Sequence, residues 1–306
     1  MSTSAVQSIE TSPRKMYTIG TVSKLTGVGA ITLRAWERRY GLIEPVRKES
    51  GHRLYTRQHI DQINRITALT QQGIRISQIR PEMLESAIGS DDGPASDQWK
   101  GYLDTMLAAI INFDEDRVEE IYNEALAIHP IGMVTRRLLT PLLVELGLRW
   151  EGGEPSSIAE EHFFAFYLRN KLGARFHHRP RRNSGPLLLL AGLPGEHHDI
   201  GLLLFALAAI EVGHRVLPFG PDMPLENLAK IARSKHCTAI VLSGAVEPPG
   251  EVLNDDLPGL VTATSLPVFV GGLSSVYGCD AITKAGAEPL GQDIDHGLQR
   301  LKEVLA

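Results

Sequence analysis

The feature that most constrains this chain is an uninterrupted apolar run at residues 186–191. The run is too short for an ordinary helix and has no polar alternation, which is typical of a strand buried on both faces. The expected strands cover 186–191, 215–219, 239–242 and 268–271, and the expected helices between and after them cover 199–212, 225–234 and 297–305. This alternation predicts a flavodoxin- or Rossmann-like parallel-sheet domain over residues 181–306.

The middle of the chain, residues 98–180, has a helical pattern throughout. Apolar residues recur at intervals of three and four, with interruptions at Pro130, at Gly132 and at the turn-forming stretch 152–155. Helices joined by such short connections pack most economically as a four-helix bundle. The fold class predicted for the whole chain is therefore multidomain, with α and α/β parts.

Residues 89–97, rich in glycine, serine and aspartate, are interpreted as a linker between this body and an N-terminal head. In the head, helices are expected over 17–27 and 30–40 with a turn at Val28 and Gly29, which is the spacing of a helix-turn-helix. A hairpin or wing is expected over 42–55, followed by helices over 56–72 and 76–87. The sequence thus predicts a winged helix-turn-helix over residues 16–88, after a disordered arm over residues 1–15.

Charge is divided unevenly between head and body. Residues 1–85 carry 13 Lys and Arg against 7 Asp and Glu, or +6, and the remainder carries 18 against 29, or −11, which together give −5. A basic head on an acidic body suggests nucleic-acid binding.

Cys237 and Cys279 are too far apart to suggest a disulfide scaffold or a thiolate metal site. No stretch resembles a membrane span or a signal peptide, so we expect a cytoplasmic protein without membrane contact.

The second helix and the wing of the head carry the candidates for DNA contact. Leu33 and Trp36 are expected to face the core, which leaves the polar side of the helix for phosphates and guanine edges. Cationic groups on a wing usually bind phosphate and fix the register on DNA. The candidate DNA-binding residues are Thr32, Arg34, Arg38, Arg39, Arg47, Lys48, Arg53 and Tyr55. A winged helix that binds protein is the alternative interpretation.

In the sheet domain, the loop after the first expected strand reads Glu196-His197-His198-Asp199. Open parallel sheets bind ligands outside the carboxyl ends of their strands, where this loop lies. The imidazole of His198 can ligate a metal through one nitrogen while a carboxylate holds the other, and Glu196 is close enough in sequence to do so. Gly201 lets a bulky group approach the helix start. An ordinary surface histidine is the alternative.

The head resembles the MerR family of regulators in three stretches. They read YTIG from Tyr17, LRAWERRYGL from Leu33 and GHRLY from Gly51. The resemblance implies a dimer that binds pseudo-palindromic promoter DNA with its recognition helix and wing. Metal-sensing members carry cysteines near the dimer helix, and this chain has none there, so the resemblance implies a different signal.

The body is similar to the cobalamin-binding module of methionine synthase and related mutases, in which cobalamin binds with its own base displaced. The similarity lies in the pattern Glu196-x-His198-x-x-Gly201, followed by Ser243 and then by Gly271-Gly272. It implies that His198 is the lower ligand of the cobalt and that Glu196 orients this histidine. It also implies that Ser243 hydrogen-bonds the displaced base and that the two glycines leave room for the nucleotide tail.

The bundle is then expected to cover the other face of the corrin. Trp150 and the pair Glu161-His162 are the candidates for enclosing an adenosyl group, and Glu160 competes for the carboxylate position. Glu151 stands where some relatives have a histidine that captures cobalt. The order of head, bundle and sheet domain resembles the cobalamin photoreceptors of the CarH type.

This second resemblance implies a light-responsive regulator, in the first instance a repressor, that uses adenosylcobalamin, assembles as a dimer or tetramer and catalyses no reaction. Two alternatives stay open. The same fold can sense cobalamin or another tetrapyrrole independently of light. Alternatively, the chain can be a cobalamin-dependent methyltransferase, although it shows no substrate-activating domain and that reading leaves the basic head unexplained.

Overall fold

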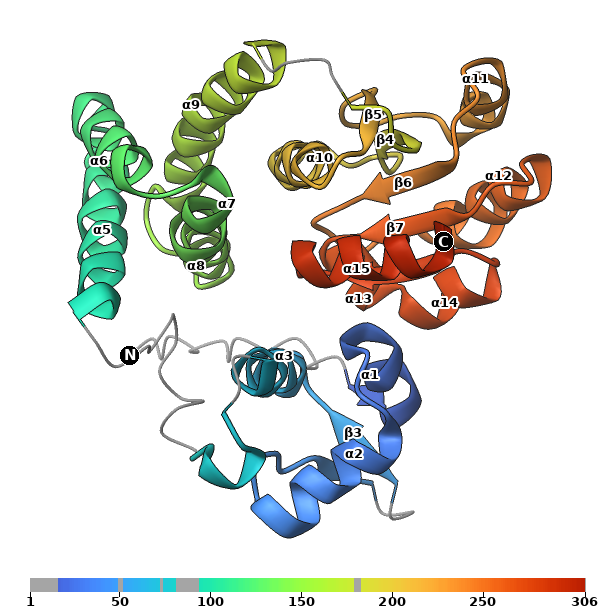
Figure 1. Ribbon diagram of the computed structural model, residues 1–306, viewed down its shortest axis with the longest axis horizontal. Helices are drawn as coiled ribbons and strands as arrows, with labels where there is room; N and C mark the ends of the chain where they lie inside the picture. The colour runs from blue at the N-terminus through green and yellow to red at the C-terminus, as the bar shows by residue number, and fades with distance from the viewer. Residues whose placement is uncertain (1–15, 49–51, 72–73, 81–93, 179–182, 306) are drawn as a thin grey trace, which may run out of the picture. The chain divides into compact units, whose positions relative to one another are not determined.

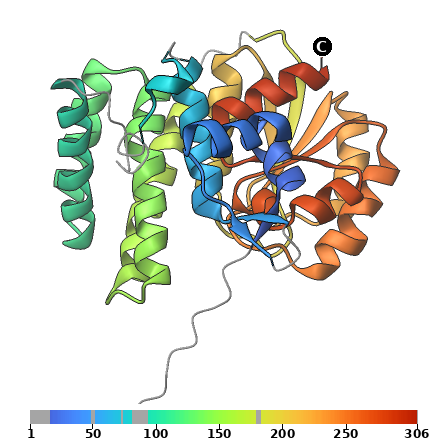
Figure 2. The ribbon, with the colours of Figure 1, turned by 90° about the horizontal axis from the view of Figure 1, so that it is seen from below.

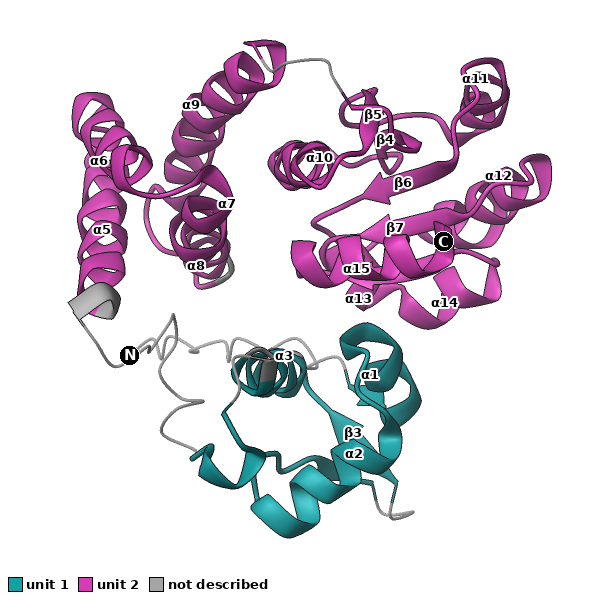
Figure 3. Cartoon of the chain, in the orientation of Figure 1, with its two compact units in different colours: residues 1–81 teal, residues 82–306 magenta. Residues whose placement is uncertain are grey.

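The computed structural model describes residues 16–48, 52–71, 74–80, 94–178 and 183–305. The chain divides into two compact units, residues 1–81 and residues 82–306 (Figure 3). The expected disordered arm lies outside the described residues, as do residues 89–93 of the expected linker. Residues 94–97 of that linker are helical instead, because the first helix of the second unit begins at Pro94.

The first unit contains a small sheet and short helices (Figure 1). Its elements are β1 (Tyr17–Thr18), α1 (Ile19–Thr26), α2 (Ala30–Ala35), the π-helical turn η1 (Trp36–Tyr40), β2 (Val46–Arg47), β3 (Arg53–Tyr55), α3 (Arg57–Gln71) and the 3-10 turn η2 (Ile76–Gln78). The strands are antiparallel in the order β1-β3-β2. The pair β2–β3 is the predicted wing, and Leu33 and Trp36 are buried as predicted.

Two elements of the head differ from the sequence prediction. Residues 17–18 pair with β3 as a strand, and α1 begins after Thr18, whose hydroxyl accepts a hydrogen bond from the Thr21 amide as an N-cap. The helix expected over 76–87 is, in its described part, a 3-10 turn that ends at Gln78. Residues 81–87 of that prediction lie outside the described part of the chain.

The helical half of the second unit has the predicted four helical segments. They are α5 (Pro94–Ile111), α6 (Glu115–Ile128), the continuous run of α7 (Ile131–Val134), η3 (Thr135–Leu139) and α8 (Thr140–Glu151), and α9 (Ser157–His178). Fully buried side chains such as Met106, Ile110, Leu142 and Phe164 fill the core between them. The last of these helices, α9, continues to His178, close to the predicted end of the bundle at residue 180.

The other half of the second unit is a parallel sheet, as predicted, but it has five strands where the sequence predicted four. Its strands are β4 (Leu187–Gly192), β5 (Arg215–Pro218), β6 (Ala239–Ser243), β7 (Val268–Gly271) and β8 (Glu288–Gly291), in the order β5-β4-β6-β7-β8. This is the strand order of flavodoxin-like folds. The sequence prediction missed β8, one of the two edge strands, because its four residues read Glu-Pro-Leu-Gly and contain no apolar run.

Helices cover both faces of this sheet (Figures 1 and 2). They are α10 (Ile200–Glu211), η4 (Leu225–Asn227), α11 (Leu228–Ser234), η5 (Val252–Asp256), α12 (Leu257–Ala263), α13 (Leu273–Tyr277), α14 (Cys279–Lys284) and α15 (Ile294–Leu305). Alternate residues of β4 face opposite ways, so Leu188 packs with α10 and α15 while Leu189 packs with α11 and α12. The sequence prediction also missed the helices between residues 252 and 284.

Helix α10 belongs to two cores. Ile200, Leu204 and Leu207 pack with the bundle, whereas Leu202 and Phe205 pack on the sheet. A helix that is apolar on all sides is stable in water only when it is covered on all sides, and α10 meets this condition. Bundle and sheet thus share one helix and form one compact unit. No helix in the described residues is both long and apolar enough to cross a membrane.

Candidate functional site

The candidate site lies where the strand order of the parallel sheet reverses. β5 lies on one side of β4, while β6, β7 and β8 follow on the other side. Connections that leave neighbouring strands toward opposite sides open a crevice at the carboxyl ends of those strands. The loop after β4 carries Glu196 and His198, and β6 ends at Ser243 beside this loop, since the Leu193 amide donates a hydrogen bond to the Ser243 carbonyl.

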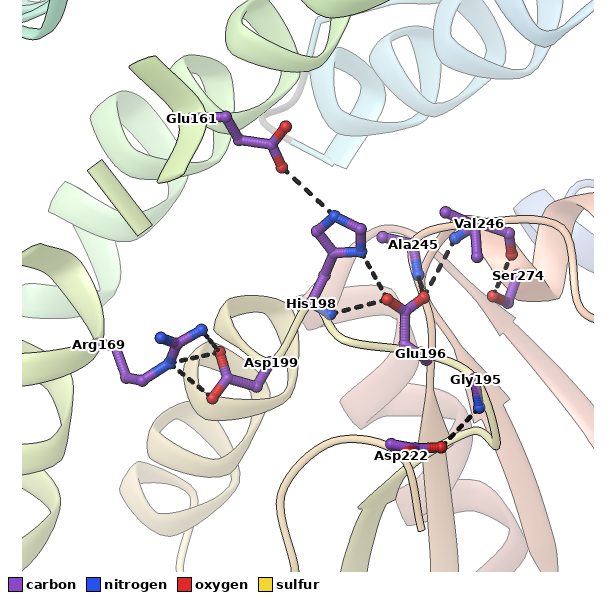
Figure 4. A network of polar contacts seen from close by, with 10 residues as sticks. All are labelled: Glu161, Arg169, Gly195, Glu196, His198, Asp199, Asp222, Ala245, Val246 and Ser274. Atoms are coloured by element: carbon purple, nitrogen blue, oxygen red, sulfur yellow. Dashed lines mark hydrogen bonds and ion pairs between the residues drawn. The ribbon is translucent and has the colours of Figure 1, made fainter. Parts of the chain in front are cut away.

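The carboxylate of Glu196 joins the two loops (Figure 4). Its Oε1 accepts hydrogen bonds from Nδ1 of His198 at 2.6 Å and from the His198 backbone amide at 2.8 Å. Its Oε2 accepts from the backbone amides of Ala245 at 2.5 Å and Val246 at 3.2 Å. Glu196 is only 2% exposed, so these bonds are shielded from water. A carboxylate bonded to Nδ1 places the imidazole proton there and leaves the lone pair of the ring on Nε2.

Hydrogen bonding also sets the charges of this pair. Burial raises the pKa of Glu196, but hydrogen bonds from His198 and from the Ala245 amide outweigh burial and lower the pKa to about 2. The hydrogen bond to Glu196 raises the pKa of His198, against an opposing effect of burial. Glu196 is therefore ionised at neutral pH, and its negative charge makes Nε2 of the imidazole a more basic ligand.

Nε2 of His198 points toward the bundle, where Oε1 of Glu161 on α9 lies 3.5 Å away (Figure 4). The sequence left Glu160 and Glu161 as alternatives for this position. Glu160 is 2% exposed and forms an ion pair with Arg149 at 2.9 Å, so it belongs to the interior of the bundle. Glu161 is therefore the carboxylate of this pair that faces the loop between β4 and α10, residues 193–199, which we call the histidine loop.

A second contact between α9 and the histidine loop was not predicted from the sequence. Arg169 on α9 forms an ion pair with Asp199, with an Nη2–Oδ1 distance of 2.8 Å, and its Nε lies 2.9 Å from both carboxylate oxygens. Asp199 directly follows His198, so this pair and the Glu161 contact hold the same loop. The adjacency of Asp199 to His198 was the one local signal in the sequence, whereas nothing local pointed to Arg169.

The predicted glycines differ in what the fold itself requires of them. A Cβ atom at Gly201 would lie 4.0 Å from the Ser243 hydroxyl, and one at Gly271 would meet nothing closer than 3.9 Å. Gly272 has a φ of 76°, and a Cβ there would lie 2.3 Å from the backbone oxygen of Gly244. Gly272 is therefore required by the fold, whereas the fold alone would accept a methyl group at Gly201 or Gly271.

Two of the bundle residues predicted to cover the upper face of the corrin are exposed to solvent. Trp150 lies near the end of α8 and is 44% exposed, and His162 is exposed on α9 beside Glu161. The described residues hold no group of three or more His, Cys, Asp or Glu that could bind a bare metal ion. A single oriented imidazole fits a metal that brings its other ligands with it, and the cobalt of a cobalamin is such a metal.

In the head, the candidate DNA-binding residues of the recognition helix are accessible. Thr32 and Arg34 on α2 and Arg38 and Arg39 on η1 are all exposed. Lys48 directly follows β2 and is also exposed. A cavity of about 330 Å³ between the wing and α2 is lined by Thr18, Ile19, Arg34, Lys48, His52, Arg53 and Leu54. Arg34 of the recognition helix and Lys48 and Arg53 of the wing therefore line one cavity beside which a phosphate chain can lie.

One residue of the wing departs from the sequence prediction, and two others make a contact that was not predicted. Tyr55 is 1% exposed and packs edge-on against His59, so its ring belongs to the core of the head and does not reach DNA. The prediction that Tyr55 contacts DNA was wrong because residues of a strand alternate between its two faces. In a strand as short as β3, the sequence does not show which residues face the core. Arg47 and Arg53 both bind the carboxylate of Glu37, a contact that the sequence prediction did not include.

Comparison with known proteins agrees with this architecture. Residues 17–86 match the MerR HTH family regulatory protein family, and residues 102–175, in the helical bundle, match a B12 binding domain. The monomethylamine corrinoid protein of Methanosarcina barkeri has a similar fold, with a TM-score of 0.55 at 20% identity over 67% of this chain and 99% of that one.

Two curated relatives match almost end to end. The HTH-type transcriptional repressor CarH of Myxococcus xanthus is 32% identical over 276 residues, which are 85% of this chain and 90% of the relative. The HTH-type transcriptional repressor CarA of the same organism is 28% identical, over 88% and 91% of the two chains. With a MerR helix-turn-helix and a B12-binding domain in one chain, this protein belongs to the family of the CarH transcriptional repressor.

Proposed function

We propose that this protein is a light-responsive repressor that binds promoter DNA in the cytoplasm and senses light through adenosylcobalamin. The observation that carries the sensing role is the Glu196–His198 pair at the switch point of the sheet, with Nε2 directed at the bundle. The similarity to the repressors CarH and CarA supports the sign of regulation. We propose a regulator without enzymatic turnover, since the chain joins this site to a DNA-binding head.

The sheet domain would hold the lower face of the cofactor. His198 would bind the cobalt through Nε2, and Glu196 would keep the ring in its orientation. Ser243 would hydrogen-bond the displaced base of the cofactor. Gly271 and Gly272 would allow the nucleotide tail to lie close to the backbone, and Gly201 would do the same at the start of α10.

The bundle would enclose the upper face. Trp150 would supply an aromatic surface, and Glu161 and His162 would supply polar groups for an adenosyl ligand. When bound, adenosylcobalamin supplies a cobalt–carbon bond that light cleaves. With the cofactor bound, these three side chains would exclude water from the adenosyl ligand.

The contacts between α9 and the histidine loop couple the site to the rest of the chain. Nε2 of His198 is the atom needed for ligation and lies 3.5 Å from Glu161, so a cofactor reaches it only after α9 and the loop have separated. The Arg169–Asp199 pair resists the same separation. A change in the position of α9 is thus the two-state element that we propose to control assembly into a dimer or tetramer. Assembly raises the affinity for a repeated operator through multivalency.

The test is size-exclusion chromatography of the full chain reconstituted with adenosylcobalamin, in darkness and after green light, with DNA binding assayed on the same fractions. We expect a larger, DNA-binding species in darkness and a smaller, weakly binding species after illumination. A visible spectrum and an oligomer size that light leaves unchanged would contradict photoreception. They would favour a regulator that senses cobalamin or another tetrapyrrole as a chemical signal. Methyl transfer without any effect on DNA binding would instead support an enzyme.

A further inference from the structure

One carboxylate lies among the cations of the expected DNA-binding surface. Glu37 is on η1, at the end of the recognition helix and directly before Arg38 and Arg39. Its Oε1 accepts a hydrogen bond from Nη2 of Arg47 at 2.8 Å, and its Oε2 accepts one from Nε of Arg53 at 2.5 Å. A negative charge beside phosphates weakens DNA binding. We therefore looked for another role of this carboxylate in its contacts with the wing.

The two arginines lie on different strands of the wing. Arg47 of β2 and Arg53 of β3 are paired directly across the hairpin. A single carboxylate of the recognition helix therefore holds both strands of the wing. The hydrogen bond between the Lys48 amide and the His52 carbonyl continues the hairpin toward its tip. These contacts join both strands of the wing to the recognition helix.

The exposure of the three side chains agrees with this role. Glu37 is 14% exposed and Arg53 22%, whereas Arg47 is 54% exposed. The hydrogen bond from Arg53 is the largest influence on Glu37 and lowers the pKa of its carboxyl group, so the carboxylate stays ionised. Because the Nε of Arg53 points to Glu37 and the side chain is mostly covered, Arg53 serves the wing more than it serves a phosphate.

We propose that Glu37 is a positioning residue that clamps the wing to the recognition helix through Arg47 and Arg53, so that both elements meet one promoter in a fixed register. This inference rests on the proposed DNA binding and assigns different tasks to the wing cations. Arg53 holds the wing, Arg47 holds it while remaining half exposed, and Lys48 contacts phosphate. Loss of the Glu37 contacts should weaken binding to a specific DNA sequence more than binding to an arbitrary one. Only specific binding requires the wing and the recognition helix to meet the DNA in a fixed register.

The test uses the full chain with adenosylcobalamin in darkness and two duplexes of equal length. One duplex is enriched from a random pool by the unmodified chain, and the other is a scrambled version of it. Glu37→Gln keeps the size of the side chain and removes its charge, and Glu44→Gln removes the same charge from an exposed position in the same unit. We expect Glu37→Gln to weaken binding to the enriched duplex about fivefold, since an ion pair that is partly exposed is lost. Binding to the scrambled duplex should stay equal or become tighter, and Glu44→Gln should not weaken binding to either.

Coupling between the two partners gives a second readout. If Glu37 acts through Arg53, the double variant Glu37→Gln with Arg53→Gln loses less affinity than the product of the two single losses. Enriched-duplex binding that is unchanged or tighter in Glu37→Gln would overturn the clamp. So would equal losses on both duplexes, as expected of partial unfolding, or single losses that multiply. Failure of the unmodified chain to enrich any sequence would contradict the proposed DNA binding itself.

Discussion

The lower and upper halves of the candidate cobalamin site are built in different ways. On the sheet domain, Glu196 is 2% exposed and makes four hydrogen bonds that fix His198 and the loop after β6. On the bundle, Trp150 is 44% exposed and His162 is exposed, and Glu161 meets the loop only at 3.5 Å. The residues of the lower half are fixed by hydrogen bonds within the protein, whereas Trp150 and His162 of the upper half are exposed to solvent.

This difference suggests a division of labour. A rigid lower half suits a bond that is retained in every state of the cofactor, because preorganisation lowers the entropic cost of binding. An open upper half suits a ligand that is present in one state and absent in another. Substitutions in the lower half should therefore affect every form of cobalamin, and substitutions in the upper half should affect the forms with a large upper ligand.

The largest effect is expected for Glu196→Gln. A glutamine side chain accepts hydrogen bonds only through its oxygen, so it cannot hold both the His198 ring and the amides of Ala245 and Val246. We expect cobalamin affinity to fall by about 10–100-fold, as for other residues that orient a metal ligand. Equilibrium titration followed by absorbance checks this, with Glu226→Gln on the exposed surface as the control. Unchanged affinity would mean that the lower half does not depend on this carboxylate.

The next largest effect is expected for substitution of the neighbouring glycines Gly271 and Gly272. Comparing the two variants distinguishes a loss of cofactor contact from a loss of folding stability. Gly271→Ala has space in the protein itself, so its thermal stability should stay unchanged while cobalamin affinity falls by about tenfold through overpacking against the cofactor. Gly272→Ala should lose stability by about 1–3 kcal/mol for the backbone conformation alone, since φ 76° with ψ −170° is open essentially to glycine only, with a further loss from the close contact with Gly244. Thermal denaturation and absorbance titration distinguish the two. Unchanged cofactor affinity in Gly271→Ala would show that the cofactor does not lie against Gly271.

A smaller and more selective effect is expected for Trp150→Ala. Removal of an exposed indole should leave stability nearly unchanged but weaken adenosylcobalamin about fivefold, which is the size of one aromatic contact. Binding of methylcobalamin, whose upper ligand is small, should hardly change. Leu148→Ala on the same helix, 53% exposed, is the matched control. Equal losses for both cofactors would show that the upper half does not discriminate between them.

The smallest effect is expected for Arg169→Ala, which breaks the pair between α9 and Asp199. Because surface ion pairs contribute little, the rate of cobalamin association should rise only about two- to threefold as separation of α9 from the loop becomes easier. Stopped-flow absorbance measures this rate. Arg136→Ala, which breaks an exposed pair with Asp295, is the control. Slower association in Arg169→Ala would indicate that the pair assists cofactor entry and does not oppose it.

The sequence predicted elements and residues that depend on local pattern. Continuous apolar runs identified the inner strands, and the spacing of Glu196, His198 and Gly201 identified the loop at their carboxyl ends. The edge strand β8 was missed because a short strand with Pro289 lacks such a run. Helices α13 and α14 were missed because each has only five or six residues.

Features that depend on tertiary packing were not predictable. The choice between Glu160 and Glu161 rests on the phase of α9 and on Arg149, which takes up Glu160. Tyr55 was assigned to the DNA surface, although the alternation of a three-residue strand places it in the core. The pairing of Glu37 with the wing joins residues 10 and 16 positions apart, and no short motif records it.

The most direct test of the sensing site is electron paramagnetic resonance of the cobalt(II) form of the bound cofactor. It is measured in protein whose histidine rings carry the heavy isotope of nitrogen. An axial imidazole from the protein should change the nitrogen splitting from triplets to doublets in the unmodified chain and in His197→Ala, and the signal of this ligand should disappear in His198→Ala. Triplets that persist in the labelled protein, or a labelled ligand that survives in His198→Ala, would contradict ligation by His198.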